Sequence, residues 1–159
     1  MTPLHFIYFY STNFSILTLH NICKLHFIID YATYISYNTV EGGGKMKTYL
    51  CIDLKTFFAS VECVVRGWDP FEVNLVVADP SRGKGAICLA ISPRLKELGI
   101  RNRCRLFEIP NSIEYYTAIP RMKLYMEYSA KIYEIYLKYI SKDDIHVYSI
   151  DEAFLDVTN

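Results

Sequence analysis

YSIDEAFLDVT, residues 148–158, is the stretch that decides which fold to expect of this 159-residue chain. Its paired acids, Asp151 and Glu152, stand between two short runs of β type, residues 145–148 and 153–157, so we expect a tight connection between two strands. An acidic pair in a bend is a weak functional signal, because turns favour acids for solvation and local hydrogen bonds. Its meaning depends on what else the chain brings to the same place.

A second decisive stretch, YLCIDLKTFFASVE, occupies residues 49–62. Its beginning is apolar and extended in type, which predicts a short buried strand over residues 47–53 that ends on Asp53. Thr56 is expected to cap the helix that follows, where apolar residues recur at helical spacing. If this strand and the final hairpin are neighbours in one antiparallel sheet, Asp53 lies beside the paired acids.

The middle of the chain predicts a small subdomain of mixed structure. Residues 74–78 and 85–91 read as strands around a turn-forming segment, and Ser92-Pro93 opens a short helix. Residues 114–119 read as another strand, and residues 121–140 repeat apolar side chains as a long amphipathic helix does. The expected fold class is therefore α/β in the mixed α+β sense.

Three carboxylates gathered at one sheet edge suit divalent-cation chemistry. Magnesium prefers oxygen ligands and binds through one or two carboxylates together with substrate phosphates. Crowded acids repel one another, so the empty site is unfavourable until cations arrive, which suggests two ions. Two ions can activate an attacking hydroxyl and hold the leaving phosphates in line. Asp53, Asp151 and Glu152 are therefore the candidate catalytic residues and metal ligands.

Both stretches resemble motifs of the Y-family (UmuC/DinB-like) translesion DNA polymerases. Residues 148–158 are similar to the signature around that family's paired acids, residues 49–62 are similar to its first motif, and the two occur in the family's order. The resemblance implies two Mg²⁺ ions held by the three acids and by the backbone carbonyl of Leu54. It also implies an antiparallel palm sheet with packed helices and a small inserted fingers subdomain.

The resemblance divides the chain and assigns further residues. It implies a partial palm at 46–57 and 117–159 and fingers at 58–116. Phe58 falls where the family has its steric gate, a ring that excludes a 2′-hydroxyl; simple core packing is the alternative. The remaining substrate-binding candidates are Phe57 and, in the stretch AISPRLKELGI (residues 90–100), Lys96 and Arg94, with Pro93 standing where many members have Tyr.

The implied activity is template-directed nucleotidyl transfer past damaged bases, with damaged template-primer DNA and a deoxynucleoside triphosphate as partners, in DNA repair and SOS mutagenesis. Family members continue through the rest of the palm, a thumb and a little finger. We therefore expect a truncated N-terminal part with little activity alone, and we assign any contact with a processivity clamp to the missing C-terminal region. The alternative is an inactive remnant that acts as a DNA- or polymerase-binding module.

Charge gives local support for a phosphate partner. The formal net charge is zero, so the strongly basic total typical of nucleic-acid binders is missing. Residues 82–105, however, carry seven basic side chains against Glu97 alone. This segment indicates either phosphate contact or an ordinary solvated surface.

Residues 1–45 differ from the rest of the chain, since they carry only four charged side chains. Polar residues interrupt the apolar run that a membrane helix needs, so we expect no membrane partner, although a membrane anchor is one alternative. Glu41–Lys45 can be encoded by a purine-rich ribosome-binding site, which suggests Met46 as the true start and a segment outside the fold. The five cysteines contain no C-x-x-C pair, and we expect a cytoplasmic protein with free thiols.

Overall fold

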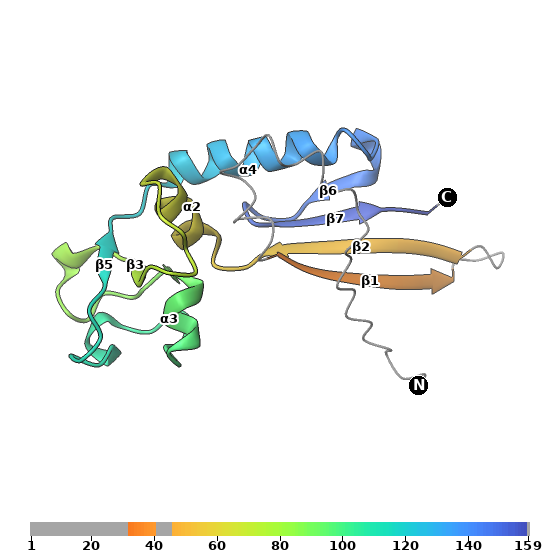
Figure 1. The fold of residues 1–159 in the computed structure, drawn as a ribbon. Helices are drawn as coiled ribbons and strands as arrows, with labels where there is room; N and C mark the ends of the chain where they lie inside the picture. Colours follow the sequence, from red (N-terminus) through yellow and green to blue (C-terminus); the bar gives the residue numbers. More distant parts are fainter. Residues whose placement is uncertain (1–31, 41–45, 159) are drawn as a thin grey trace.

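Two β-sheets make up the part of the chain that the computed structural model describes, residues 32–40 and 46–158 (Figure 1). The larger sheet is antiparallel and has the spatial order β1 (Ala32–Val40), β2 (Met46–Leu54), β7 (Glu152–Asp156) and β6 (Ile145–Val147). In the smaller sheet, β3 (Leu75–Val77) lies between β4 (Ala90–Ile91), which is antiparallel to it, and β5 (Tyr116–Ala118), which is parallel.

Among the described residues, three α-helices connect and cover these sheets. α4 (Met122–Tyr136) lies over one face of the four-stranded sheet, and α2 (Phe57–Val65) lies between the two sheets (Figure 1). α3 (Pro93–Glu97) belongs to the small sheet's end of the molecule. The mixed architecture, with an antiparallel sheet, packed helices and a small inserted unit, confirms the expected fold class.

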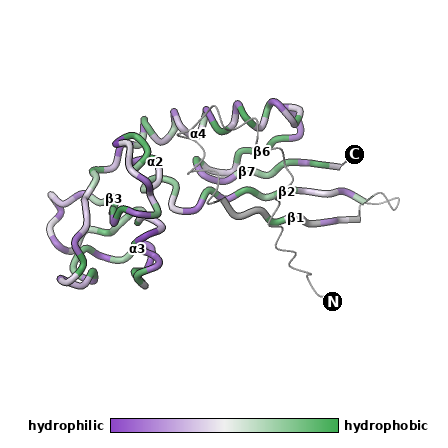
Figure 2. Tube along the Cα trace, viewed as in Figure 1, coloured by the Kyte–Doolittle hydropathy of each residue, from purple (hydrophilic) through white to green (hydrophobic). Residues whose placement is uncertain are grey.

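Side-chain alternation gives the large sheet one buried and one open face. Ile52 and Leu54 of β2 and Leu155 of β7 are each only 4% exposed and belong to the main core. Because successive strand residues point to opposite faces, Asp53 and Glu152 lie on the face turned away from that core. Along α4, hydrophobic and hydrophilic residues likewise alternate, and its buried stripe packs on the sheet (Figure 2).

The main core extends across both sheets. It joins Ile52 and Leu155 of the large sheet to Leu75 and Val77 of the small one through the buried residues of α2. A second cluster around Leu95 belongs to the small subdomain alone. The two sheets are therefore held together by shared apolar packing.

Several elements differ from the sequence-based expectations. β4 contains only residues 90–91, because the preceding backbone pairs with the loop around Cys104: Cys88 N–H donates to the Cys104 carbonyl at 2.8 Å. Thr56 precedes α2 as expected but gives no side-chain cap, since its backbone is left-handed with φ 54° and its hydroxyl lies 3.0 Å from Ser60 Oγ. The long helix ends at Tyr136 and not at residue 140.

β1 lies within the segment that we expected to stay outside the fold. All nine of its residues pair with β2, from Ala32 opposite Leu54 to Val40 opposite Met46. This pairing corrects the expectation for residues 32–40, because a β2 edge rich in unpaired backbone groups can recruit any extended neighbour. The expectations for residues 1–31, including the membrane anchor, lie outside the described residues.

The division into palm and fingers stays a prediction. Strand β5 pairs with β3 through Ala118, so the small sheet reaches past the boundary expected at residue 117. Within the described ranges, no helix combines the length and the apolar character needed to cross a lipid bilayer.

Candidate metal and nucleotide site

The three predicted acids occupy neighbouring backbone positions where β2 ends and β7 begins. Asp53 is the direct cross-strand partner of Glu152, and the Leu54 N–H donates to the Asp151 carbonyl at 2.9 Å. Residues opposite each other in an antiparallel pair have Cβ atoms about 5 Å apart, so these two carboxylates are neighbours on the open sheet face. The structure thus brings together residues that are about a hundred positions apart in the sequence.

Ser149 orders the bend that carries the paired acids. Its Oγ lies 2.8 Å from Asp151 Oδ1 and 3.0 Å from Glu152 Oε2, so one hydroxyl serves both carboxylates. The N–H groups of Tyr148 and Ser149 both donate to the Glu152 carbonyl, at 3.0 and 3.2 Å. The expected tight connection between the last two strands is confirmed.

Asp53 has a different internal partner, Lys55. The Lys55 ammonium forms an ion pair and hydrogen bond with Asp53 Oδ2. Lys96 of α3 lies near both: burial lowers its pKa, the Lys55 charge lowers it further, and Asp53 opposes the change. The predicted fingers helix therefore delivers one of its basic side chains to the strand end that carries Asp53.

The donor chemistry of this edge fits Mg²⁺, since three carboxylates and a backbone carbonyl are hard oxygen ligands. Among the described residues, however, no three His, Cys, Asp or Glu side chains are gathered into one group that could hold a metal ion. The hydrogen bonds explain why: Asp53 is turned to Lys55, while Asp151 and Glu152 are turned to Ser149. Closing the site around a cation requires rotation of these side chains.

The two adjacent phenylalanines of α2 have different surroundings. Phe58 is half-buried and stacks on Tyr125 of α4, with ring centroids 4.6 Å apart and an interplanar angle of 14°. Phe57 is only 2% exposed and packs in the main core. We expected the Phe57 side chain to contact substrate. Its ring instead lies beneath the surface, within the main core.

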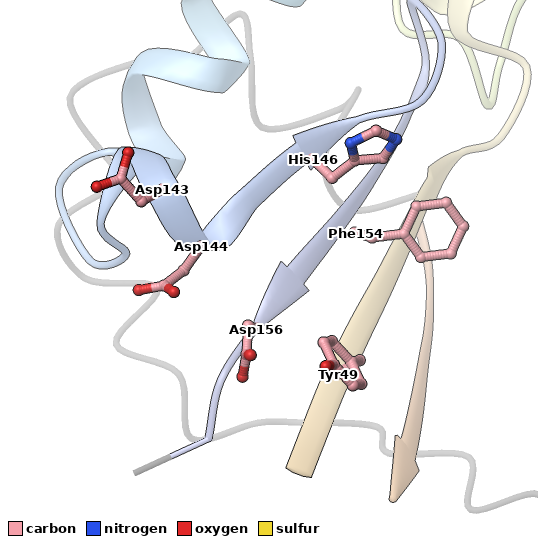
Figure 3. A pocket seen from close by; sticks show the side chains of 6 residues that line it. All are labelled: Tyr49, Asp143, Asp144, His146, Phe154 and Asp156. Atoms are coloured by element: carbon pink, nitrogen blue, oxygen red, sulfur yellow. The ribbon is translucent and has the colours of Figure 1, made fainter. Parts of the chain in front are cut away.

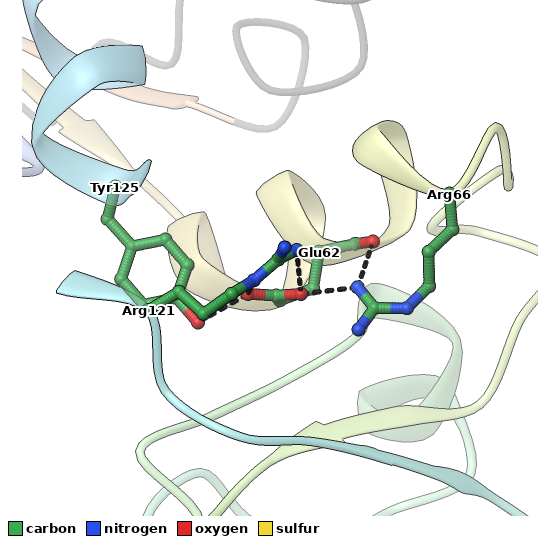
Figure 4. A network of polar contacts seen from close by, with 4 residues as sticks. All are labelled: Glu62, Arg66, Arg121 and Tyr125. Atoms are coloured by element: carbon green, nitrogen blue, oxygen red, sulfur yellow. Dashed lines mark hydrogen bonds and ion pairs between the residues drawn. The ribbon is translucent and has the colours of Figure 1, made fainter. Parts of the chain in front are cut away.

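A buried carboxylate supports the Phe58 stacking partner. Glu62 has no exposed side-chain surface and accepts a hydrogen bond from the Tyr125 hydroxyl at 2.8 Å (Figure 4). Arg121 donates to both Glu62 oxygens, at 3.0 and 2.7 Å, and Arg66 donates to the same carboxylate. Burial alone would raise the pKa of Glu62, but these donors prevail and lower it.

Unlike Lys96, the other candidate residues at α3, Arg94 and Ser92, interact with α3 itself. The Arg94 guanidinium lies 3.2 Å from the Glu97 carboxylate on the helix surface, so it is turned toward its own helix. Ser92 is fully buried and caps α3, accepting from Leu95 N–H at 3.4 Å. Elsewhere in residues 82–105, Arg101 and Arg103 are exposed.

Two hollows flank the large sheet. One of about 510 Å³ lies between α4 and the bend, with Tyr133, Ile150 and Asp151 in its lining. The other, of about 210 Å³, lies on the open face toward the end of β7 away from Glu152, where Tyr49, Phe154 and Asp156 meet the acids before β6 (Figure 3). The first hollow adjoins the candidate metal edge, whereas the second is remote from it.

Sequence reasoning missed three residues of this region. Lys55 is two residues after Asp53 but lies in the turn beyond the end of β2, so only its nearness in the sequence could have suggested the pair. Ser149 has the same spacing from Asp151. Glu62 was detectable as a lone acid among the apolar positions of α2, a pattern that requires a buried partner.

Residues 52–159, more than half of the chain, match the family described as impB/mucB/samB. The chain belongs to the impB/mucB/samB family. Solved structures agree: an insertion ternary complex of Dbh DNA polymerase is 28% identical with a TM-score of 0.59, over 70% of this chain and 32% of that one. Together these findings confirm the Y-family resemblance.

Curated relatives of this impB/mucB/samB chain come from several bacteria. UvrX of Bacillus subtilis (strain 168) is 40% identical over 111 residues, which are 69% of this chain and 27% of UvrX. DNA polymerase IV 2 of the same organism is 35% identical over 72% of this chain and 27% of that relative. The DNA repair protein homolog YozK, also from this strain, is 39% identical over 64% of the chain and 90% of YozK. The chain thus spans about a quarter of the first and second of these relatives and most of the third.

Proposed function

We propose that this chain supplies the metal- and nucleotide-binding part of an error-prone translesion DNA polymerase. The observation that carries the proposal is the cross-strand pairing of Asp53 with Glu152. Next to this pair, the Leu54 N–H donates a hydrogen bond to the Asp151 carbonyl. Similarity to proteins named DNA polymerase IV supports the same reaction class. The reaction is template-directed nucleotidyl transfer past damaged bases, in DNA repair and SOS mutagenesis.

In this proposal the catalytic residues act by holding cations. Asp53, Asp151, Glu152 and the carbonyl oxygen of Leu54 hold two Mg²⁺ ions, and Ser149 orients the paired acids before the ions bind. When bound, such ions activate an attacking hydroxyl and neutralise phosphate charge. The open face of the sheet leaves this edge accessible to a primer end.

The substrate side is formed by α2 and α3. The stacked Phe58 ring presents a flat surface that discriminates against a 2′-hydroxyl, and Tyr125 fixes its plane. The charge of Lys96 interacts with that of Asp53, and in this proposal Lys96 contacts the triphosphate that arrives with the cations. Arg94 joins it only if its pair with Glu97 opens, which is an exposed and therefore weak contact.

The partners follow from the reaction: a damaged template-primer and a deoxynucleoside triphosphate, in the cytoplasm. The neighbour solved as an insertion ternary complex supports this assignment by its name. A contact with a processivity clamp stays a prediction for the region of the family that lies beyond this chain.

Equilibrium dialysis of radiolabelled dATP against the 159-residue chain, with and without Mg²⁺, tests the proposal. We expect Mg²⁺-dependent binding that weakens at least about tenfold in Asp53→Asn, because a lost carboxylate ligand removes the anchor of the metal–phosphate contact. Asp143→Asn is the matched control, an exposed acid before β6 that lies away from the bend. Binding that is independent of Mg²⁺, or equal in the wild type and Asp53→Asn, would contradict the assignment.

A second candidate is a DNA- or polymerase-binding module without catalysis. It is favoured by the observation that the described acids do not gather into one three-ligand group. Extension of a labelled primer on a damaged template separates the two functions. Nucleotide incorporation supports the polymerase, whereas metal and DNA binding without incorporation supports the module.

A further inference from the structure

Asp53 forms an ion pair with a lysine side chain of the same chain. The ammonium of Lys55 contacts Asp53 Oδ2, the same carboxylate that the proposed function assigns to a metal ion. The side chains are 41% and 30% exposed, so the pair is open to solvent and exchangeable.

The local backbone explains why Lys55 reaches this position. Lys55 directly follows Leu54, the last residue of β2, and lies in the turn before α2, from which its ammonium reaches back to Asp53. The chain turns immediately afterwards at Thr56, whose left-handed φ of 54° is uncommon for a β-branched residue. The tight turn keeps Lys55 over the strand end and sends the following residues into α2.

The other two acids have a neutral partner. Asp151 and Glu152 share the Ser149 hydroxyl, at 2.8 and 3.0 Å, while Asp53 is the one of the three acids that pairs with a charged group within the described residues. Lys96 lies close enough for its charge to interact with both Lys55 and Asp53. Without metal, the negative charge of Asp53 is therefore already neutralised by Lys55. A divalent ion that approaches Asp53 is repelled by the ammonium groups of Lys55 and Lys96.

We infer that Lys55 is the resident counter-cation of Asp53, which a divalent ion must displace before Asp53 can serve as its ligand. The inference rests on the proposed role of Asp53 as a metal ligand. Displacement has two consequences: metal binding is weaker than the three acids alone would give, and the ammonium is released toward the face where the substrate phosphates arrive. Lys55 is thus a positioning residue that sets the metal affinity of the empty site.

Metal binding without nucleotide provides the test. Free Mn²⁺ is measured by electron paramagnetic resonance during titration of the full chain and of Lys55→Gln, Lys55→Arg and Lys142→Gln. Because the pair is exposed, we expect Lys55→Gln to bind Mn²⁺ about two- to fivefold more tightly, with Lys55→Arg close to the wild type. Lys142→Gln, an equal charge change at the far end of β6 from the bend, should leave the affinity unchanged.

The outcomes separate this inference from the proposed function. If Asp53→Asn weakens Mn²⁺ binding while Lys55→Gln does not tighten it, the counter-cation role is wrong and the metal ligand stands. If Asp53→Asn has no effect on Mn²⁺ binding, the ligand assignment itself fails. Equal tightening in Lys55→Gln and Lys142→Gln would reduce the effect to overall charge and overturn the inference. Lys55→Met repeats the measurement without a polar head group, and circular dichroism checks that each variant is folded.

Discussion

At the scale of single residues, Glu62 is the one charged side chain that is buried in the described part of the chain. Its carboxylate has no exposed surface and is surrounded by Arg121, Arg66 and Tyr125 (Figure 4). Burying a charge is unfavourable unless every lone pair finds a donor, and here two guanidinium groups and a hydroxyl supply them. The network joins the helix that bears Phe58 to the first turn of α4.

We expect Glu62→Gln to lower the free energy of unfolding by about 2 kcal/mol at pH 7, because a neutral amide leaves two guanidinium groups without a counter-charge. Urea denaturation followed by circular dichroism measures the change. Glu127→Gln, an exposed acid on α4, is the control and should change stability by less than about 0.5 kcal/mol.

The stability difference between the wild type and Glu62→Gln is also expected to depend on pH, in a direction that the pKa shift of Glu62 fixes. The folded-state pKa of Glu62 is lowered, so its stabilising contribution is present above the unfolded-state pKa, near 4.5, and is lost as pH falls through the folded-state value. The stability difference between wild type and Glu62→Gln should therefore be constant from about pH 7 to 5 and shrink in more acidic solution. A difference that grows toward acid would contradict the network.

Two buried thiols give a residue-scale prediction about reactivity. Burial raises the pKa of Cys63 to about 12, and burial together with the neighbouring Cys104 raises the pKa of Cys88 to about 12. Since the thiolate is the reactive form, neither side chain should react with a disulfide reagent at pH 8 in the folded protein. Labelling followed by peptide mass spectrometry, with the urea-unfolded protein as control, checks this. Rapid native labelling of Cys63 would show that α2 opens easily.

At the scale of elements, β1 covers the outer edge of β2 although it lies outside the family match. The match begins at residue 52, whereas β1 ends at Val40, yet nine residue pairs join it to β2. An uncovered strand of nine residues is a template for pairing with another chain. β1 therefore protects β2 in this chain.

We expect residues 46–159 to self-associate and residues 32–159 to do so much less, because only the longer variant keeps β1. Size-exclusion chromatography with light scattering at equal concentrations compares the two. A monomeric, cooperatively melting 46–159 protein would show that the β2 edge needs no cover.

At the scale of the whole molecule, one core spans both sheets and a second serves the small subdomain alone. The main cluster includes Ile52, Leu75 and Leu155, whereas Leu95 and Ile91 belong to the second. This division predicts that the small subdomain can be loosened while the large sheet stays packed.

Leu95→Ala tests this division, because it removes a fully buried side chain from the second cluster. We expect a local destabilisation of about 2–5 kcal/mol, seen as faster amide hydrogen exchange in β3, β4 and α3. The amides of β2 and β7 should keep their protection. Equal acceleration in both sheets would mean that the molecule unfolds as a single unit.

The sequence by itself determined the period of each long element and named the candidate residues of the site. The apolar run before Asp53, the helical spacing that follows it and the acids of residues 148–158 are local patterns, which follow from the backbone period and from the apolar or polar character of neighbouring residues. They predicted β2, α2, α4 and the final hairpin, with errors mainly at the ends. The pairing of Ile87 with Arg105 in place of a longer β4 is a non-local event that no such pattern contains.

Only the tertiary structure decided which partners each side chain received. Asp53 and Glu152 share a cross-strand position because β7 pairs with β2, and strand pairing across so long a sequence separation follows from packing of the whole core. The same packing placed Phe57 inside and left the neighbouring Phe58 stacked on Tyr125. The pairing of Lys55 with Asp53 likewise depends on the turn geometry. A sequence names the charged and aromatic groups, but the free energy of burying them depends on distances that only the folded chain defines.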